Sequence, residues 1–447
     1  MNTPQQPFFD VRMKGFAARA SVAAVLASLD SRVQPLPGEI VSLPQLAGRV
    51  LADAVVSPVD VPGFARAAMD GYAVCSEDTA TSAPLDVLGE SMPARPFTGT
   101  IERGQAVRIT TGAPIPAGAD AVLMAEFAQT AADGRVHSRE VVKAGKHIVR
   151  VGEDVAKGRE VLPVSRRLRP QDVGLLASIG VSTVRVHRQP RVAVLVTGNE
   201  LLPPGSLPEG YRIVDSNSPM LATLVARDGG ECLSVRYLHD DYAAVRDAIR
   251  DTDADVILVS GGTSVGTEDH APRAVGELGE LAFHGVAIRP AGPLGVGFRL
   301  CPRVASDGRG EEWETRRHGD TERNPAHLPI SPSPQLPIFL LPGNPVSCLC
   351  AYDLFAGRVI RRLGGRSWEL PYRSAMLPLA AKIASAVNRV DYVRVMVRNG
   401  QVTPILGSGA SNLSSTVSAD GFVLAPAERE ELAAGEMVEV WLYDAVP

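Results

Sequence analysis

The sequence predicts a multidomain protein of the α/β plus β class. The chain has 447 residues, too many for one hydrophobic core, so two to four domains are expected. Its middle alternates β-branched apolar runs with helical segments, a pattern typical of βαβ units and of a doubly wound, mostly parallel sheet. Both flanks carry short apolar runs interrupted by glycine and proline, which favours small β-rich domains.

The central region, residues 189–366, is expected to form the α/β domain. The apolar runs predict strands over 191–197, 233–238, 255–260, 282–288 and 337–341. The intervening segments predict helices over 219–226, 242–250 and 271–278, and a long apolar helix over 346–363. Strands that alternate with helices at this spacing pair in parallel.

The flanking regions divide into three further domains. Residues 61–156 are expected to form a β-rich domain, with short strands at 106–109 and 121–125. Residues 367–447 form a second small β domain, with alternating runs at 391–397 and 437–442. Residues 1–60 and 157–188 together form a discontinuous helical and linker domain.

A charged, proline-rich insertion interrupts the α/β region at residues 306–334. It has no hydrophobic periodicity and too few apolar residues to offset the entropy cost of ordering it. We interpret it as a disordered surface segment; a lid is the alternative, because it ends just before a loop of the expected site.

Composition excludes some classes of function. The net charge of −5 argues against a nucleic-acid-binding protein, which needs a concentrated basic surface. The apolar N-terminal stretch, residues 15–30, is too short to span a membrane and lacks the pattern of a secretory signal. We therefore expect a cytoplasmic enzyme that binds no membrane. The five cysteines form no CxxC pair and are interpreted as buried thiols.

Polar loops follow the predicted strands where a doubly wound sheet binds its ligands. These loops are 197–200 (TGNE), 239–241 (HDD), 260–269 (SGGTSVGTED) and 342–345 (PGNP). Their glycines let backbone N–H groups approach an anion, and the helix that follows each loop favours negative charge. Their agreement in position predicts a site for an anionic ligand.

The same loops carry carboxylates at the same edge of the sheet. Glu200, Asp269 and either Asp240 or Asp241 would repel a bound phosphate unless a hard cation such as Mg²⁺ lay between them. The prolines of the last loop fix a rigid turn that suits the wall of a flat-ring site. The loops together predict an anionic ligand with a metal ion.

The β-rich flank holds a second polar group. Asp70 lies at an expected tight turn, Thr110 and Thr111 precede a Gly–Ala–Pro turn, and Glu153 and Asp154 follow Gly152. Aspartate and threonine are common turn residues, so these positions alone favour no function over ordinary turns.

At these residues the chain resembles the molybdopterin molybdenumtransferases, the MoeA family that includes the E domain of gephyrin. The matching motifs are 60–64 (DVPGF) with 68–73 (AMDGYA), 108–114 (RITTGAP), 152–154 (GED), 197–201 (TGNEL), 261–266 (GGTSVG) with Asp269, and 342–346 (PGNPV). They occur in the family's order, over about residues 15–447. A glycine loop with PGNP also occurs in the adenylyltransferases of the same pathway.

The resemblance implies four domains: an α/β domain of the molybdopterin-binding type, a β-rich second domain, a small C-terminal β-barrel, and a discontinuous domain that takes part in dimerisation. It implies a homodimer whose active cleft lies between the α/β domain of one chain and the β-rich domain of the other. The implied substrates are adenylylated molybdopterin and molybdate, with Mg²⁺ as cofactor and AMP as a product. The upstream adenylyltransferase and molybdoenzymes are candidate partners.

Residue roles follow from the same motifs. The resemblance implies catalytic roles for Asp70, Thr111, Asp154, Glu200, Asp269 and Arg289. It implies metal binding by Glu200, Asp240 and Asp269, with Asp240 preferred over Asp241 although the spacing leaves both open. Substrate binding is implied for Thr197, Gly198, Ser260, Gly261, Gly262, Ser264, Gly266, Pro342, Gly343, Asn344, Pro345 and Ser411.

The chain departs from the family where cations are usual. The family commonly reads Lys-x-x-x-Lys-Pro-Gly-Lys-Pro where residues 285–293 read GVAIRPAGP, so only Arg289 of three cations remains. Anion sites depend on such charges. Arg66 and the arginines of the 306–334 insertion are two possible replacements. The thinned charge favours, as an alternative, a family member that binds molybdopterin or a partner as a scaffold. Adenylyl transfer is a third reading, which the presence of the N-terminal β-rich region opposes.

Overall fold

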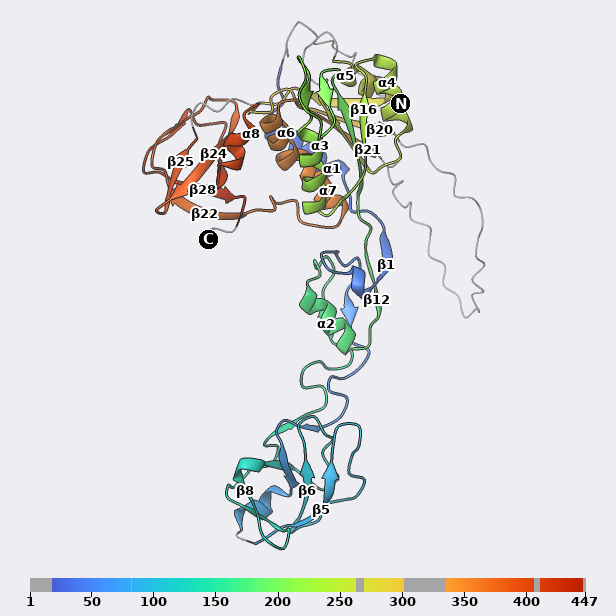
Figure 1. The fold of residues 1–447 in the computed structure, drawn as a ribbon, viewed down its shortest axis with the longest axis vertical. Helices are drawn as coiled ribbons and strands as arrows, with labels where there is room; N and C mark the ends of the chain where they lie inside the picture. The colour runs from blue at the N-terminus through green and yellow to red at the C-terminus, as the bar shows by residue number, and fades with distance from the viewer. Residues whose placement is uncertain (1–17, 82, 263–268, 301–334, 406–410, 445–447) are drawn as a thin grey trace, which may run out of the picture. The chain divides into compact units, whose positions relative to one another are not determined.

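The computed structural model describes residues 18–81, 83–262, 269–300, 335–405 and 411–444. They form two compact units, one of residues 38–186 and one that joins the N-terminal segment up to residue 37 to residues 187–447 (Figure 1). The insertion at 306–334 lies outside the described residues, as do Ser264 and Gly266. Among the described helices, none is long and apolar enough to cross a membrane.

A six-stranded sheet forms the centre of the larger unit. Its strand order is β16-β13-β17-β21-β20-β18. Four strands run parallel, namely β16 (Glu231–Leu238), β13 (Arg191–Thr197), β17 (Val256–Ser260) and β21 (Gln335–Leu341). At one edge, β20 (Gly295–Leu300) and β18 (Gly279–His284) are antiparallel. The multidomain mixture of sheets and helices is confirmed, and the sheet is mostly parallel.

Helices cover both faces of this sheet because its strands alternate apolar side chains between the two faces. On β17, Val256 and Leu258 face one core, and Ile257 and Val259 face the other. The first core packs against α1 (Val22–Arg32), α3 (Asn217–Arg227), α6 (Pro345–Ala351) and α7 (Gly357–Leu363). The second packs against α4 (Tyr242–Asp251) and α5 (Ala271–Leu278) (Figure 1).

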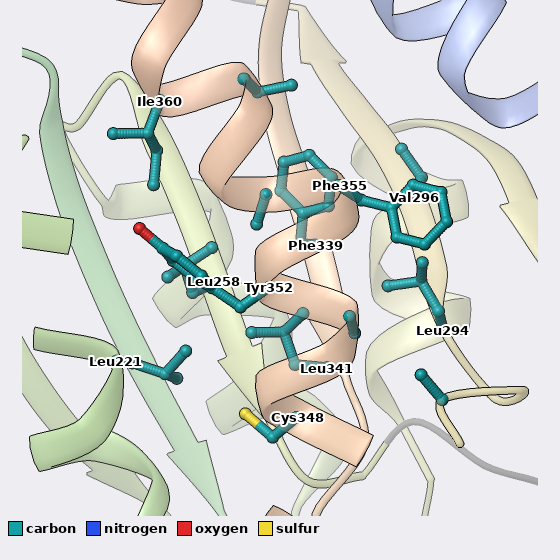
Figure 2. Close-up of a cluster of buried hydrophobic side chains, with 14 of the residues drawn as sticks. Leu221, Leu258, Leu294, Val296, Phe339, Leu341, Cys348, Tyr352, Phe355 and Ile360 are labelled. Carbon is teal, nitrogen blue, oxygen red and sulfur yellow. The ribbon is translucent and has the colours of Figure 1, made fainter. Parts of the chain in front are cut away.

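The larger core is built on the long C-terminal helix of the α/β domain. One π-helical turn at Tyr352–Ala356 joins α6 to α7, so the predicted helix over 346–363 is present in three consecutive pieces. Figure 2 shows Tyr352 and Phe355 from this helix among Phe339 and Leu341 of β21. These side chains are fully buried, and each is expected to contribute about 1.5–3 kcal/mol to folding.

Two expectations about this unit were wrong. The strand expected over 282–288 divides at Gly285, which has a positive φ of 90°; β18 ends at His284, and Ile288–Arg289 forms the separate strand β19. The N-terminal helix α1 was assigned to the linker domain, but Val25 and Leu29 are buried in the core of the α/β domain.

The C-terminal residues form a β sheet that closes on itself. Its strands are β22 (Arg373–Pro378), β24 (Val390–Arg398), β25 (Gln401–Pro404), β26 (Gly421–Ala425) and β28 (Met437–Leu442), joined by β19. Their order is β19-β24-β26-β28-β22, and β25 pairs with β24. A bridge between Leu379 and Val402 links β25 back to the end of β22. The C-terminal region is thus a small domain built of β strands.

A buried polar network ties this barrel to the α/β domain. Asp353 is fully buried on the π turn and accepts hydrogen bonds from Arg227 at 2.9 Å and Tyr372 at 2.9 Å. Tyr392 of β24 also donates to Asp353, at 3.4 Å. Because a buried carboxylate is costly unless it is fully paired, the network fixes the barrel against the π turn and the end of α3.

The smaller unit, residues 38–186, contains separate hydrophobic cores. The four-stranded sheet β5-β6-β4-β7 comprises β5 (Asp86–Ser91), β6 (Gln105–Ile109), β4 (Gly71–Val74) and β7 (Ala121–Met124). Another core is formed by β1 (Gly38–Ser42), β12 (Thr183–His187), β2 (Val55–Val56), β11 (Glu160–Leu162) and α2 (Pro170–Ser178). The short strands β3 (Arg66–Ala67) and β10 (Ile148–Val149) pair with each other, as do β8 (Ala128–Thr130) and β9 (Val136–Ser138).

The cysteine prediction was partly wrong. Cys348 and Cys350 are buried thiols, and burial raises the pKa of each. Cys75 and Cys232 are half-buried free thiols.

The N-terminus of α2 carries a testable pH dependence. Asp172 accepts hydrogen bonds from Arg166 Nη2 and from the Arg169 backbone N–H, and its side chain is 5% exposed. Burial by itself would raise the pKa of Asp172, but these hydrogen bonds outweigh it and lower the pKa to about 2. Because the folded pKa lies below the unfolded value of 3.8, the stabilisation is present above pH 4 and is lost as the pH falls towards 2.

We expect Asp172→Asn to lower the opening free energy of α2 by about 2 kcal/mol at pH 7, and by much less near pH 2. Hydrogen exchange of the α2 amides at several pH values measures this difference. Asp53→Asn, an exposed position in the same unit, is the control and should leave the exchange unchanged. If the effect of Asp172→Asn did not depend on pH, the stabilisation of α2 would not come from the ionised Asp172 carboxylate.

Candidate functional site

One pocket gathers the predicted loops at the carboxyl edge of the sheet. We call it the loop pocket; its volume is about 580 Å³. The parallel register aligns the ends of the strands, because Ser260 pairs with Val196 on one side and with Leu341 on the other. The predicted residues that line it are Thr197, Gly198, Glu200, Asp240, Ser260, Gly261, Gly262, Asp269, Pro342, Gly343, Asn344, Pro345 and Ser411.

The floor of the loop pocket is a close contact between Thr197 and two glycines. A Cβ added to Gly261 would lie 2.4 Å from the Thr197 carbonyl oxygen, and one added to Gly262 would lie 2.7 Å from Thr197 Oγ1. Both glycines have positive φ, 89° and 60°. Only glycine fits this turn without strain, so backbone lines this part of the pocket. Among the described residues, no group accepts or donates a hydrogen bond at the buried Thr197 Oγ1.

The structure distinguishes between the two adjacent aspartates after β16. Asp240 lines the loop pocket, and its Oδ2 accepts a hydrogen bond from the Asn199 N–H at 2.9 Å. Asp241 instead caps α4, accepting from the Ala244 N–H at 2.9 Å. Asp241 is therefore held by the helix, and Asp240 is the carboxylate that belongs to the pocket.

The carboxylates of the loop pocket do not form a ready-made metal cage. Glu200, Asp240 and Asp269 all line the pocket, yet no three acidic, His or Cys side chains within the described ranges lie close enough to hold a metal ion. Mg²⁺ is usually held by one or two carboxylates together with substrate phosphates and waters. The oxygen donors of this pocket fit that mode of binding.

The polar pocket residues around the start of α3 were missed from the sequence. Asp215 and Asn217 precede and begin α3 and line the loop pocket. Asp215 is buried and accepts hydrogen bonds from the N–H groups of Asn217 and Ser218, at 2.8 and 3.2 Å. An Asp-Ser-Asn run before a predicted helix is a capping signal, and it could have identified this end of the connection between β13 and α3.

A second pocket adjoins the first and is basic. We call it the arginine pocket; its volume is about 840 Å³, and it shares Pro293, Pro342 and Asn344 with the loop pocket. Its charged lining residues are Arg19, Arg289, Arg389, Arg394 and Asp391. It lies between the α/β domain and the barrel, which are joined here because β19 pairs in parallel with β24.

Arg289 was grouped with the carboxylates, but it lines the arginine pocket and is absent from the lining of the loop pocket. Pairing of β19 with β24 sets it beside Asp391, whose Oδ2 accepts from Arg289 Nη2 at 2.6 Å. Asp391 is 1% exposed and also accepts from Arg389 at 2.8 Å. One buried carboxylate thus fixes two guanidinium groups, which have further N–H groups for an anion.

The pocket arginines bear on the missing cations of the sequence. The arginine pocket also contains Arg19, Arg389 and Arg394, which are far in sequence from residues 285–293. No local sequence pattern therefore predicted that they line the same pocket as Arg289. Of the two sources considered, the 306–334 insertion lies outside the described residues, and Arg66 lies on β3 of the smaller unit. The described part of the larger unit therefore carries concentrated positive charge without either.

The smaller unit holds the other predicted group. Asp70 Oδ1 accepts hydrogen bonds from the Thr111 N–H at 2.6 Å and the Thr111 hydroxyl at 2.8 Å, and these bonds lower the pKa of Asp70. Asp154 is exposed, and its N–H donates to the Val61 carbonyl at 3.1 Å, within the DVPGF motif. These two hydrogen bonds join the motif that contains Asp70 to the motif that contains Thr111.

Comparison with known proteins agrees with this geometry. Family models match residues 20–180 as "MoeA N-terminal region (domain I and II)", 193–362 as "Probable molybdopterin binding domain" and 376–443 as "MoeA C-terminal region (domain IV)". A protein of Haemophilus influenzae named molybdopterin molybdenumtransferase is 32% identical over 91% of this chain and 94% of its own length. The chain belongs to the MoeA family.

Other MoeA relatives cover the chain equally well. Molybdopterin molybdenumtransferase 2 of Mycobacterium tuberculosis is 35% identical over 90% of this chain and 94% of its own length. The crystal structure of a molybdopterin biosynthesis MoeA protein from Pyrococcus horikoshii has a TM-score of 0.76 and 30% identity, and the match covers 96% of this chain and all of that one. The MoeA resemblance therefore extends through every domain, including the segment that holds Asp70 and Thr111.

Proposed function

We propose that this chain is a molybdopterin molybdenumtransferase, which inserts molybdenum from molybdate into adenylylated molybdopterin and releases AMP. The observation that carries the proposal is the joining of a glycine-lined acidic pocket to an arginine pocket. One substrate has a phosphoanhydride, and the other is a small oxyanion. Two adjacent subsites of different charge suit this pair of ligands.

The loop pocket would bind the phosphoanhydride. The turn at Gly261 and Gly262 presents backbone, and the Thr197 hydroxyl beside it is a donor without a protein partner among the described residues. Phosphate oxygens accept such hydrogen bonds. Glu200, Asp240 and Asp269 would hold Mg²⁺ against the anhydride, where it would offset negative charge on the leaving AMP.

The arginine pocket would hold molybdate beside the dithiolene of the bound molybdopterin. Arg289 and Arg389 are held in place by Asp391, so they need little reorganisation to bind an oxyanion. Water would add across the P–O–P bridge, so that AMP leaves and the phosphate stays on molybdopterin; the two dithiolene thiols would replace one oxo group of molybdate, which leaves as water with the two thiol protons. Ser411, which lines the loop pocket, would donate a hydrogen bond to the bound molybdopterin substrate.

We further propose that the chain acts as a homodimer in which the group around Asp70, Thr111 and Asp154 serves the same reaction. The full-length match to MoeA relatives supports this, because those residues lie in the matched N-terminal region. An acidic residue whose pKa is lowered stays ionised at neutral pH and can orient donors around a polyanionic substrate.

The direct test is to incubate the purified protein with adenylylated molybdopterin, molybdate and Mg²⁺ and to follow AMP. We expect AMP release together with formation of molybdenum cofactor, and loss of both when Mg²⁺ is removed. Binding of adenylylated molybdopterin without AMP release would instead favour a scaffold, the alternative raised by the missing lysines. In that case the carboxylates of the loop pocket would have no catalytic role.

A further inference from the structure

Asn217 is held in the wall of the loop pocket by three hydrogen bonds. Its Nδ2 donates to Ser260 Oγ at 3.0 Å and to the Gly343 carbonyl at 2.8 Å. Its backbone N–H donates to Asp215 Oδ1 at 2.8 Å. The side chain is 5% exposed, and it joins the loop after β17 to the loop after β21.

The remaining polar atom of this side chain is unused. Asn217 Oδ1 is buried and has no hydrogen-bond partner among the described residues. Because the Gly343 carbonyl can only accept, the amide must place Nδ2 towards it, so Oδ1 is fixed as an acceptor. An unsatisfied buried acceptor is costly, so an acceptor in a pocket wall is a place where a water, an ion or a ligand donor is expected.

We propose that Asn217 helps to bind the nucleotide: its Oδ1 accepts a hydrogen bond from a ribose hydroxyl of the adenylate. This inference rests on the proposed function, since it presumes that the loop pocket binds the anhydride. An acceptor oxygen repels phosphate oxygens and selects a neutral O–H or N–H donor. On the nucleotide side of the anhydride, the donors nearest the phosphate are the 2′ and 3′ hydroxyls.

Asp215 explains why the acceptor stays in place. The Asp215 carboxylate accepts hydrogen bonds from the N–H groups of Asn217 and Ser218 and, at 2.9 Å, from the Tyr237 hydroxyl. The start of α3 is thereby fixed before substrate arrives, so binding a hydroxyl there costs little ordering entropy. Oδ1 then sets the distance between the ribose and the glycine turn at Gly261.

Calorimetric titration of the full-length protein in Mg²⁺ with AMP and with 2′,3′-dideoxy-AMP tests the proposal. The wild type should bind AMP about tenfold more tightly than the dideoxy compound, as expected for one well-placed hydrogen bond. Asn217→Ala should remove this preference, so that both compounds bind with similar affinity. A purely structural role would weaken both ligands alike and keep the tenfold ratio, which would overturn the proposal.

Two further variants guard against loss of folding. Asn217→Asp keeps an acceptor oxygen and loses the donor to Gly343, so it should bind both ligands more weakly and still prefer AMP; loss of the preference would contradict the inference. Thr223→Ala, which changes an exposed residue of α3 outside the pocket lining, should keep the wild-type ratio. If the wild type binds both compounds equally, this inference fails alone; if it binds neither, the proposed function fails with it.

Discussion

Asp269→Asn is expected to slow AMP release by about 100-fold or more, the usual cost of removing a charged group that stabilises a transition state. The change keeps the shape of the side chain and removes its charge. Asp269 lines the loop pocket with Glu200 and Asp240, so the substitution weakens the acidic group proposed to hold Mg²⁺. Raising the Mg²⁺ concentration should recover part of the lost rate, because the variant would bind Mg²⁺ more weakly at the same place in the pocket.

The matched control is Asp251→Asn. Asp251 is an exposed aspartate of the same domain, at the end of α4, and it pairs with Arg250. Its loss should change the rate of AMP release by less than about twofold, since exposed ion pairs contribute little. Similar losses from the two substitutions, measured as initial rates of AMP release, would show that the carboxylate at 269 has no special role.

Arg289→Ala is expected to raise the molybdate concentration that gives half the maximal rate by about tenfold or more, the scale of one charge-assisted hydrogen bond. Asp391 keeps Arg389 and Ser385 as partners, so the buried carboxylate is not left unpaired. The variant should therefore fold, and thermal unfolding checks this. Arg289→Lys should recover part of the affinity, because it keeps the charge but loses the planar fork.

Arg429→Ala is the control for the loss of an arginine from the barrel. Arg429 is exposed and pairs with Glu436 outside the arginine pocket. The Arg429→Ala variant should therefore show the wild-type dependence of AMP release on molybdate concentration. An unchanged molybdate dependence in Arg289→Ala would place the oxyanion elsewhere and leave the arginine pocket without a function.

Much of the α/β domain could be predicted because its signals are local. The β-branched run at 191–197 forms β13 with those bounds, and the helix expected over 271–278 forms α5. The strand β20 was missed because Gly295 and Gly297 weaken its strand pattern. A Cβ on Gly297 would lie 2.3 Å from Val275, so the glycine that obscures the strand is the one that lets α5 pack on it.

The two pockets differ in how far the sequence could predict them. The loop pocket follows from a general rule, because parallel strands deliver their loops to one edge. The arginine pocket does not, since Arg19, Arg289 and Arg394 meet only after the barrel packs on the α/β domain. The choice between Asp240 and Asp241 likewise needed the capping hydrogen bond to Ala244, which spacing alone does not reveal.

The central claim is that acidic residues of two chains serve one reaction, and subunit mixing tests it most directly. Asp70→Asn and Asp269→Asn proteins are each expected to be nearly inactive. If the chain is a twofold dimer with each site completed by both chains, unfolding and refolding an equal mixture should restore about a quarter of wild-type AMP release, because half the dimers are mixed and each has one intact site. No recovery, with mixed dimers demonstrated by mass spectrometry, would contradict the account.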